Sequence, residues 1–184
     1  MRKNFGVKPW LYPQPVLIIG TYDAEGNPDA MNAAWGGQYS PNQVMLSLGE
    51  HKTTENIKLK GAFTVSFATA SQVVASDYVG IVSAAYEPDK MKKSGFTTTK
   101  SEFVDAPVIN ELPLTLECKF VKFNEDGKVI GEIVNVSADE AILGEGDKID
   151  AAKLDAIIFD PVNAAYLRFG EKVGNAFRDG AKLK

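Results

Sequence analysis

The sequence predicts a mainly β domain in which an antiparallel sheet closes into a barrel flanked by helices. Three segments, 44–48, 63–67 and 114–120, alternate apolar residues with others, as strands do when successive side chains point to opposite faces. Turn-forming segments at 23–28 and 124–128 separate neighbouring strand-like stretches. This spacing of strands and turns is typical of a small antiparallel barrel.

The N-terminal strands follow one another closely. Residues 15–22 are apolar on both faces, as in a fully buried strand. The turn after them contains Gly26, which is free to adopt a positive φ. The next strand is expected over 31–35, and Gly36–Gly37 then mark a place where the backbone bends or is approached closely.

Two helices are expected between the middle strands. The first begins near Thr53 or Thr54, and the second has Ser71 as its N-cap. Their apolar residues are Ile57 and Leu59 in the first helix and Val74, Tyr78, Val79 and Val82 in the second.

The C-terminal half contains a hairpin and a tail. The turn at 124–128 leads into a strand expected over 129–136. The tail, 150–184, carries one short helix and the apolar run 157–159, and we expect it to pack on the barrel or on a partner subunit.

Length and composition limit the class of protein. The 184 residues predict a single domain spanning 1–184. With 20 Lys+Arg against 24 Asp+Glu the net charge is −4, which argues against nucleic-acid binding. No segment approaches the roughly 20 apolar residues of a membrane span. Cys118 is the only cysteine, which excludes an intrachain disulfide. These features predict a cytoplasmic protein with no nucleic-acid or membrane partner.

Few residues can perform chemistry by themselves. His51 is the only histidine, which excludes a zinc site built from several histidines, and we predict no metal site. Motifs of metalloproteases, serine hydrolases and P-loop enzymes are absent. Cys118 lies on an alternating segment and is interpreted as a small buried hydrophobe. We therefore expect no catalytic side chain and an organic cofactor instead.

The segment 51–57 is a candidate phosphate site. It follows Gly49 and begins a helix, where free N–H groups and the positive end of the helix dipole attract anions. Lys52 adds a positive charge, and Thr53 and Thr54 add hydroxyl donors. The alternative is that one of the threonines only caps a surface helix.

Two further candidates lie outside this segment. The small residues of 31–35 would let a flat ring lie against the strand, with Asn32 and Trp35 beside it, although the same segment could be a core strand. Lys90 could contact a phosphate, although a lysine beside Lys92 and Lys93 more often lies on a solvated face.

In their order along the chain, these segments resemble the flavin reductase-like family of FMN-binding split barrels, and its flavoredoxin branch in particular. The matching segments are Pro13–Val16, Asp23–Gly26, Asn32–Trp35, Val44–Leu48, Thr53–Ile57, Gly80, Ser83, Asp89–Lys90, Ala106–Glu111, Leu116–Lys119 and Tyr166–Gly170. The resemblance implies a six-stranded antiparallel Greek-key split barrel that forms a homodimer with FMN near the subunit interface.

The resemblance also implies which residues bind FMN. The residues implied at the isoalloxazine ring are Asn32, Ala33, Ala34, Trp35, Ser47, Leu48 and Gly49. Those implied at the phosphate are Lys52, Thr53, Thr54 and Asn56, with Ser83 and Lys90 as further candidates. His51 stands where the family often has Arg, so we expect phosphate affinity to depend on pH.

The resulting hypothesis is an FMN-dependent oxidoreductase that uses NAD(P)H as reductant and passes electrons to a small-molecule or protein acceptor. One alternative is an electron-transfer flavoprotein that does not oxidise NAD(P)H itself. Another is a small-barrel binding module without redox chemistry. The acidic balance argues against an oligonucleotide-binding barrel, which needs a basic face.

Overall fold

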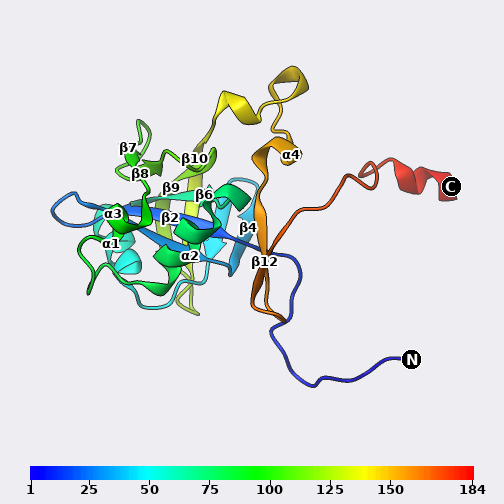
Figure 1. The fold of residues 1–184 in the computed structure, drawn as a ribbon, viewed down its shortest axis with the longest axis horizontal. Helices are drawn as coiled ribbons and strands as arrows, with labels where there is room; N and C mark the ends of the chain where they lie inside the picture. Colours follow the sequence, from blue (N-terminus) through cyan, green and yellow to red (C-terminus); the bar gives the residue numbers. More distant parts are fainter.

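The computed structural model describes residues 1–184 and confirms the mainly β fold (Figure 1). Its main sheet has seven antiparallel strands in the order β3-β2-β6-β9-β10-β5-β4. The strands are β2 (Leu17–Tyr22), β3 (Pro28–Ala33), β4 (Gly36–Ser40), β5 (Gln43–Leu46), β6 (Ala62–Phe67), β9 (Leu114–Phe123) and β10 (Val129–Ala138).

The connection between β3 and β4 explains why this sheet curls into a barrel. The two strands lie at opposite edges of the sheet, yet only Ala34 and Trp35 separate them in the chain. An extended chain spans at most about 3.6 Å per residue, so the two edges must lie next to each other. Counting β3 and β4 as one bent strand gives the six strands that the resemblance implies.

Alternation along the strands builds two apolar layers. Leu17 and Ile19 point into the barrel, where they pack in one core cluster with Leu46 and Phe63. Ile18 points to the opposite face and packs in a second cluster. This confirms the prediction that the first long strand is buried on both faces. Gly36 is closely approached as expected, because a Cβ there would lie 2.6 Å from the Leu46 side chain.

The helices are α1 (Lys52–Lys60), α2 (Val73–Ile81), α3 (Lys90–Ser94) and α4 (Ala151–Leu154), and the 3₁₀ turns are Ala70–Gln72, Glu140–Ile142, Glu145–Asp147 and Asp179–Leu183. Of the helices, α1, α2 and α3 lie near one another on one side of the molecule, and α4 lies apart from them (Figure 1). The first helix begins one residue earlier than predicted, with His51 as N-cap, and Leu59 is exposed on it.

The start of the second helix was predicted wrongly. Ser71 lies inside a 3₁₀ turn, and Gln72 is the N-cap of α2. The Ser71 hydroxyl pairs with the Thr69 hydroxyl at 3.1 Å, so it is not used as a cap. Val74 is exposed, and Val82 lies beyond the last helical residue.

Two small sheets complete the fold. β1 (Gln14–Pro15) pairs with β11 (Ile157–Asp160), which forms a hairpin with β12 (Ala165–Arg168). β7 (Thr98–Lys100) pairs with β8 (Pro107–Ile109). No helix combines the length and the apolar character that crossing a membrane requires.

Both ends of the chain extend away from the barrel (Figure 1). Residues 1–13 and 169–184 are exposed, or nearly so, along their whole length. The part of the predicted tail that packs on the body ends at the β11–β12 hairpin, where Ile157 joins the outer core cluster. The terminal segments carry exposed apolar side chains, among them Leu11 and Phe177.

Candidate functional site

A cavity of about 180 Å³ lies where β3, the start of α1, the end of α2 and the start of α3 meet. Its lining residues are Asp29, Met31, His51, Lys52, Thr53, Val79, Gly80, Ile81, Val82, Ser83, Ala84 and Lys90. Five residues predicted at the phosphate or next to it gather here, namely His51, Lys52, Thr53, Ser83 and Lys90. These residues come from three separate segments of the chain, and the fold brings them together at one cavity.

The start of α1 presents hydrogen-bond donors to this cavity. His51, the N-cap, is extended, with φ −142° and ψ 164°. Lys52 and Thr53 are the first helical residues, and their N–H groups have no acceptor within the helix. These donors and the positive end of the helix dipole favour a negatively charged ligand.

An ion pair is buried beside the helix start. Lys90 Nζ lies 3.0 Å from Asp29 Oδ1, and both side chains are about 5% exposed or less. The Thr53 hydroxyl lies 3.4 Å from Asp29 Oδ2. Lys52 is half-buried and has no ion-pair partner. The lining therefore carries two ammonium groups and one carboxylate.

Two predicted phosphate residues point into the protein instead. The Thr54 hydroxyl accepts a hydrogen bond from the His51 backbone N–H at 2.8 Å and fixes the start of α1. The Asn56 amide is buried and donates to the Thr21 hydroxyl at 3.1 Å. Because their polar groups already have partners, the structure assigns these side chains a role in holding α1 against the barrel.

The residues predicted around a flat ring form a second group beside the first. The Ser47 backbone N–H donates to the Trp35 carbonyl at 2.8 Å, which joins the crossing between β3 and β4 to the end of β5. The strand predicted over 31–35 ends at Ala33, because the chain bends there to cross between the sheet edges. Trp35 is consequently 54% exposed, and Ala34 is half-buried.

This second group continues directly into the cavity. The side chains of Ala33 and Leu48 are buried in the barrel core and so anchor the backbone on either side of them. Gly49 adopts φ +71°, a conformation that favours glycine. A Cβ atom added to Gly49 would lie 3.7 Å from His51 Nε2. The segment from Ser47 to His51 thus links the exposed Trp35 region to the start of α1.

Asn32 lies on the opposite face of β3 from this core. Its amide donates to the Ser76 carbonyl of α2 at 2.9 Å and lies 3.5 Å from the Tyr166 hydroxyl. Burial and a hydrogen bond from its hydroxyl to Asp77 raise the pKa of Tyr166 to about 12. Asn32 therefore ties β3 to α2 and to the β11–β12 hairpin.

Sequence reasoning missed Asp29, Met31 and the end of α2. Asp29 is the second residue of β3 and lies close to a turn, where an acidic residue is ordinary, so nothing in the sequence sets it apart. Its significance depends on Lys90, which is distant in sequence and 3.0 Å away in space. Cys118 is buried as predicted, and this burial raises its pKa to about 12.

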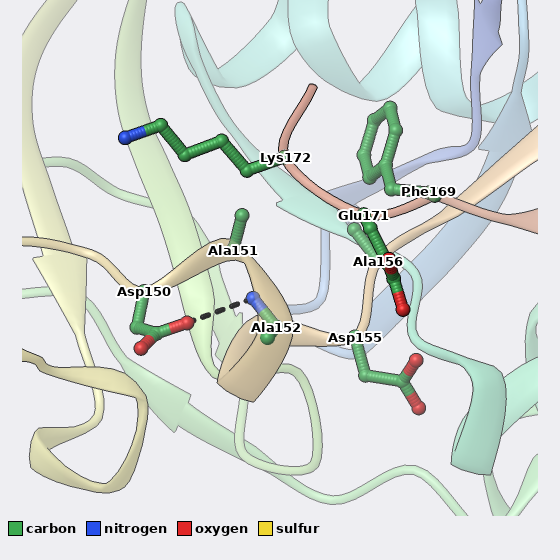
Figure 2. Close-up of a pocket in the computed structure, with 9 residues that line it drawn as sticks. Asp150, Ala151, Ala152, Asp155, Ala156, Phe169, Glu171 and Lys172 are labelled. Carbon is green, nitrogen blue, oxygen red and sulfur yellow. Dashed lines mark hydrogen bonds between the residues drawn. The ribbon is translucent and has the colours of Figure 1, made fainter. Parts of the chain in front are cut away.

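A larger cavity, of about 530 Å³, lies between α4 and the start of the C-terminal segment (Figure 2). Two of its three acidic side chains already have partners. Asp150 accepts a hydrogen bond from the Ala152 N–H at 2.8 Å, and Asp155 pairs with Arg168 at 2.9 Å. None of the predicted site residues lines this cavity, so we assign the site to the smaller one.

The sequence of the chain matches a protein family and a curated relative. A family model described as "Flavin reductase like domain" matches residues 10–153. The chain is 32% identical over 139 residues to an uncharacterised protein of Archaeoglobus fulgidus, covering 72% of this chain and 76% of the relative.

Solved structures extend the likeness over nearly the whole chain. A flavoredoxin of Desulfovibrio vulgaris is similar with a TM-score of 0.94 and 37% identity, covering 98% of this chain and 100% of that one. A flavoredoxin of Methanosarcina acetivorans is similar with a TM-score of 0.88 and 27% identity, covering both chains fully. Component B of a nitrilotriacetate monooxygenase from Bacillus cereus shares the fold, with a TM-score of 0.77, 20% identity and coverage of 95% and 100%.

Proposed function

Because the chain belongs to the flavin reductase-like domain family and resembles its flavoredoxin branch, we propose that it binds FMN and acts as a flavoprotein oxidoreductase. The observation that carries this proposal is the cavity at the start of α1, where Lys52 and Lys90 meet unpaired backbone N–H groups. This donor set suits the phosphate of a flavin mononucleotide.

The residues present fit such a group on two counts. The anion site is built from three segments and contains the ammonium groups of Lys52 and Lys90. Beside it lie Trp35 and Ser47–Gly49, where Trp35 and Gly49 are exposed and where Ser47 and Gly49 carry little side-chain bulk. A ring system could lie along this stretch while its phosphate occupies the cavity.

When bound, FMN supplies the redox chemistry by accepting two electrons and passing them on. The chain's own residues bind and orient it. Lys52 and the N–H groups of Lys52 and Thr53 hold the phosphate, and the backbone at Trp35 and Ser47–Gly49 flanks the ring. No side chain is assigned a catalytic proton transfer, so the protein contributes positioning and electrostatics.

The reductant is the finer part of the proposal. We propose NAD(P)H, on the family relationship. A second candidate is an electron-transfer flavoprotein that does not oxidise NAD(P)H itself. The electron acceptor in either case would be a small molecule or a protein.

Two measurements test these proposals. Purified protein given excess FMN and then desalted should keep a flavin absorption band, and complete loss of flavin would reject FMN binding and favour a non-redox module. The loaded protein is then mixed anaerobically with NADH or NADPH. Rapid bleaching of the band supports the reductase, whereas a persistent yellow colour supports the carrier.

We also propose that the protein is a cytoplasmic homodimer. The terminal segments leave the barrel and expose Phe5, Leu11, Phe169 and Phe177, which a second copy would cover. Sedimentation of the full chain tests this, because a mass of 19.9 kDa at micromolar concentration would reject the dimer.

A further inference from the structure

Asp29 is a buried acidic residue inside a cavity that otherwise favours anions. It lies on the same face of β3 as Met31 and Ala33, which is the inner face of the barrel. It is only 4% exposed, and its Oδ1 has no hydrogen-bond partner apart from the facing Lys90 ammonium. A carboxylate next to a phosphate site costs binding energy through repulsion, so its presence needs a physical reason.

Lys90 supplies that reason. Lys90 is 3% exposed and is the first residue of the short helix α3. A buried amine without a counter-ion favours its neutral form, because burial penalises the charge. The other ionisable groups of the cavity are His51 and Lys52 from α1, and neither can supply a negative charge.

The surrounding elements offer no substitute for Asp29. α2 packs against α3 and carries Asp77 and Tyr78, but Asp77 is bonded to the Tyr166 hydroxyl. On the α3 segment itself, Glu87 pairs with Lys93, and Asp89 is exposed. Asp29 is thus the only carboxylate that faces Lys90 within ion-pair distance.

We propose that Asp29 is a positioning residue of the phosphate site, which fixes the Lys90 ammonium at the cavity wall before the phosphate arrives. Thr53 completes this arrangement, since its hydroxyl lies 3.4 Å from the second carboxylate oxygen and belongs to the first turn of α1. One carboxylate therefore accepts a hydrogen bond from the first turn of α1 and pairs with the ammonium of α3, which holds both elements at the same cavity. This inference rests on the proposed binding of FMN.

The test compares FMN with riboflavin, which lacks the phosphate. Asp29→Asn keeps the shape of the side chain and removes its charge. At pH 8.5 we expect the variant to bind FMN about tenfold more weakly, the size expected for one charge-assisted contact, and to bind riboflavin as the wild type does. Glu55→Gln is the matched control. It removes an exposed carboxylate from the first turn of α1, and Glu55 does not line the cavity, so the FMN affinity of this variant should not change.

A second readout separates an effect through Lys90 from a direct effect of Asp29 on the ligand. Lys90→Gln removes the ammonium that Asp29 faces. In this background Asp29→Asn should weaken FMN binding little further, and the double variant should bind FMN about tenfold more weakly than the wild type. If the single variants do not fold, the double variant, which buries no unpaired charge, decides alone, and FMN affinity equal to that of the wild type would overturn the proposal.

Three results with Asp29→Asn would reject the proposal. Equal weakening of FMN and riboflavin by Asp29→Asn, unchanged FMN affinity, or tighter FMN binding would each reject the positioning role. If wild type binds FMN while one of these results is obtained, only this inference fails. If wild type retains no FMN at all, it is the proposed function that fails.

Discussion

Replacing Lys52 with Ala separates ligand binding from stability. Lys52 lines the cavity, is half-buried and has no ion-pair partner, so no internal contact is lost with it. A hydrogen bond between charged groups contributes about 1.5–3 kcal/mol, and solvent screening at a half-exposed site favours the lower end. Since about 1.4 kcal/mol corresponds to a factor of ten, we expect FMN to bind about tenfold more weakly.

The same substitution should change the stability of the folded state very little. Lys and Ala differ little in helix propensity, so the free energy of unfolding should change by less than about 0.5 kcal/mol. The assay is a titration of FMN followed by the quenching of its fluorescence, at low and at moderate salt, alongside urea unfolding of the apoprotein. The tenfold difference should shrink as salt rises, because screening weakens the partly exposed charge.

Lys58→Ala is the control, because Lys58 is exposed on the same helix and does not line the cavity. It changes the net charge by the same amount and should leave FMN affinity unchanged. Equal effects of the two substitutions would refute a local contact and leave only the general field of the protein. An unchanged affinity in Lys52→Ala would remove Lys52 from the site.

Three further predictions concern the framework. Thr54→Val should lower the free energy of unfolding by about 1–2 kcal/mol and Tm by about 2–8 °C in a thermal melt, because its hydroxyl fixes the start of α1; an unchanged Tm would contradict this. Gly131→Ala should cost about 1–3 kcal/mol in urea unfolding, because the new methyl group would clash with the Phe63 ring, and the cost should shrink in a Phe63→Leu background. A hydrogen bond from the Tyr12 hydroxyl lowers the pKa of Asp160 to about 2, so its contribution to stability is present above about pH 4 and lost as the pH falls toward 2. In Tyr12→Phe this acid dependence of urea unfolding should be shallower, and identical profiles would contradict it.

The strands could be predicted from the sequence because their pattern is local. Alternation gave the central strands and the hairpin turn at 124–128, and the structure has β9 and β10 on either side of that turn. The burial of Glu117 could not be predicted in this way. This carboxylate is 2% exposed, with the hydroxyl of Ser101 and the amide of Asn135 as its partners, and this arrangement exists only after the chain has folded.

The site was predictable in part for the same reason. The helix start at 51–53 can be recognised from consecutive residues, whereas the directions of Thr54 and Asn56 depend on which face of α1 meets the barrel. The exposure of Trp35 follows from the crossing between the sheet edges, which no local pattern encodes. Lys90 resembles a solvated lysine in the sequence, and only its pairing with Asp29 explains its burial.

The charges of the cavity explain how an acidic protein can hold an anion. The whole chain carries −4, while the cavity lining carries Lys52 and Lys90 against Asp29, a local sum of +1 with His51 neutral. A doubly charged phosphate is not balanced by +1, so the N–H groups at the start of α1 must supply the rest. These groups are fixed in place by the Thr54 hydroxyl, which makes the rigidity of the helix start as important to affinity as the lysines.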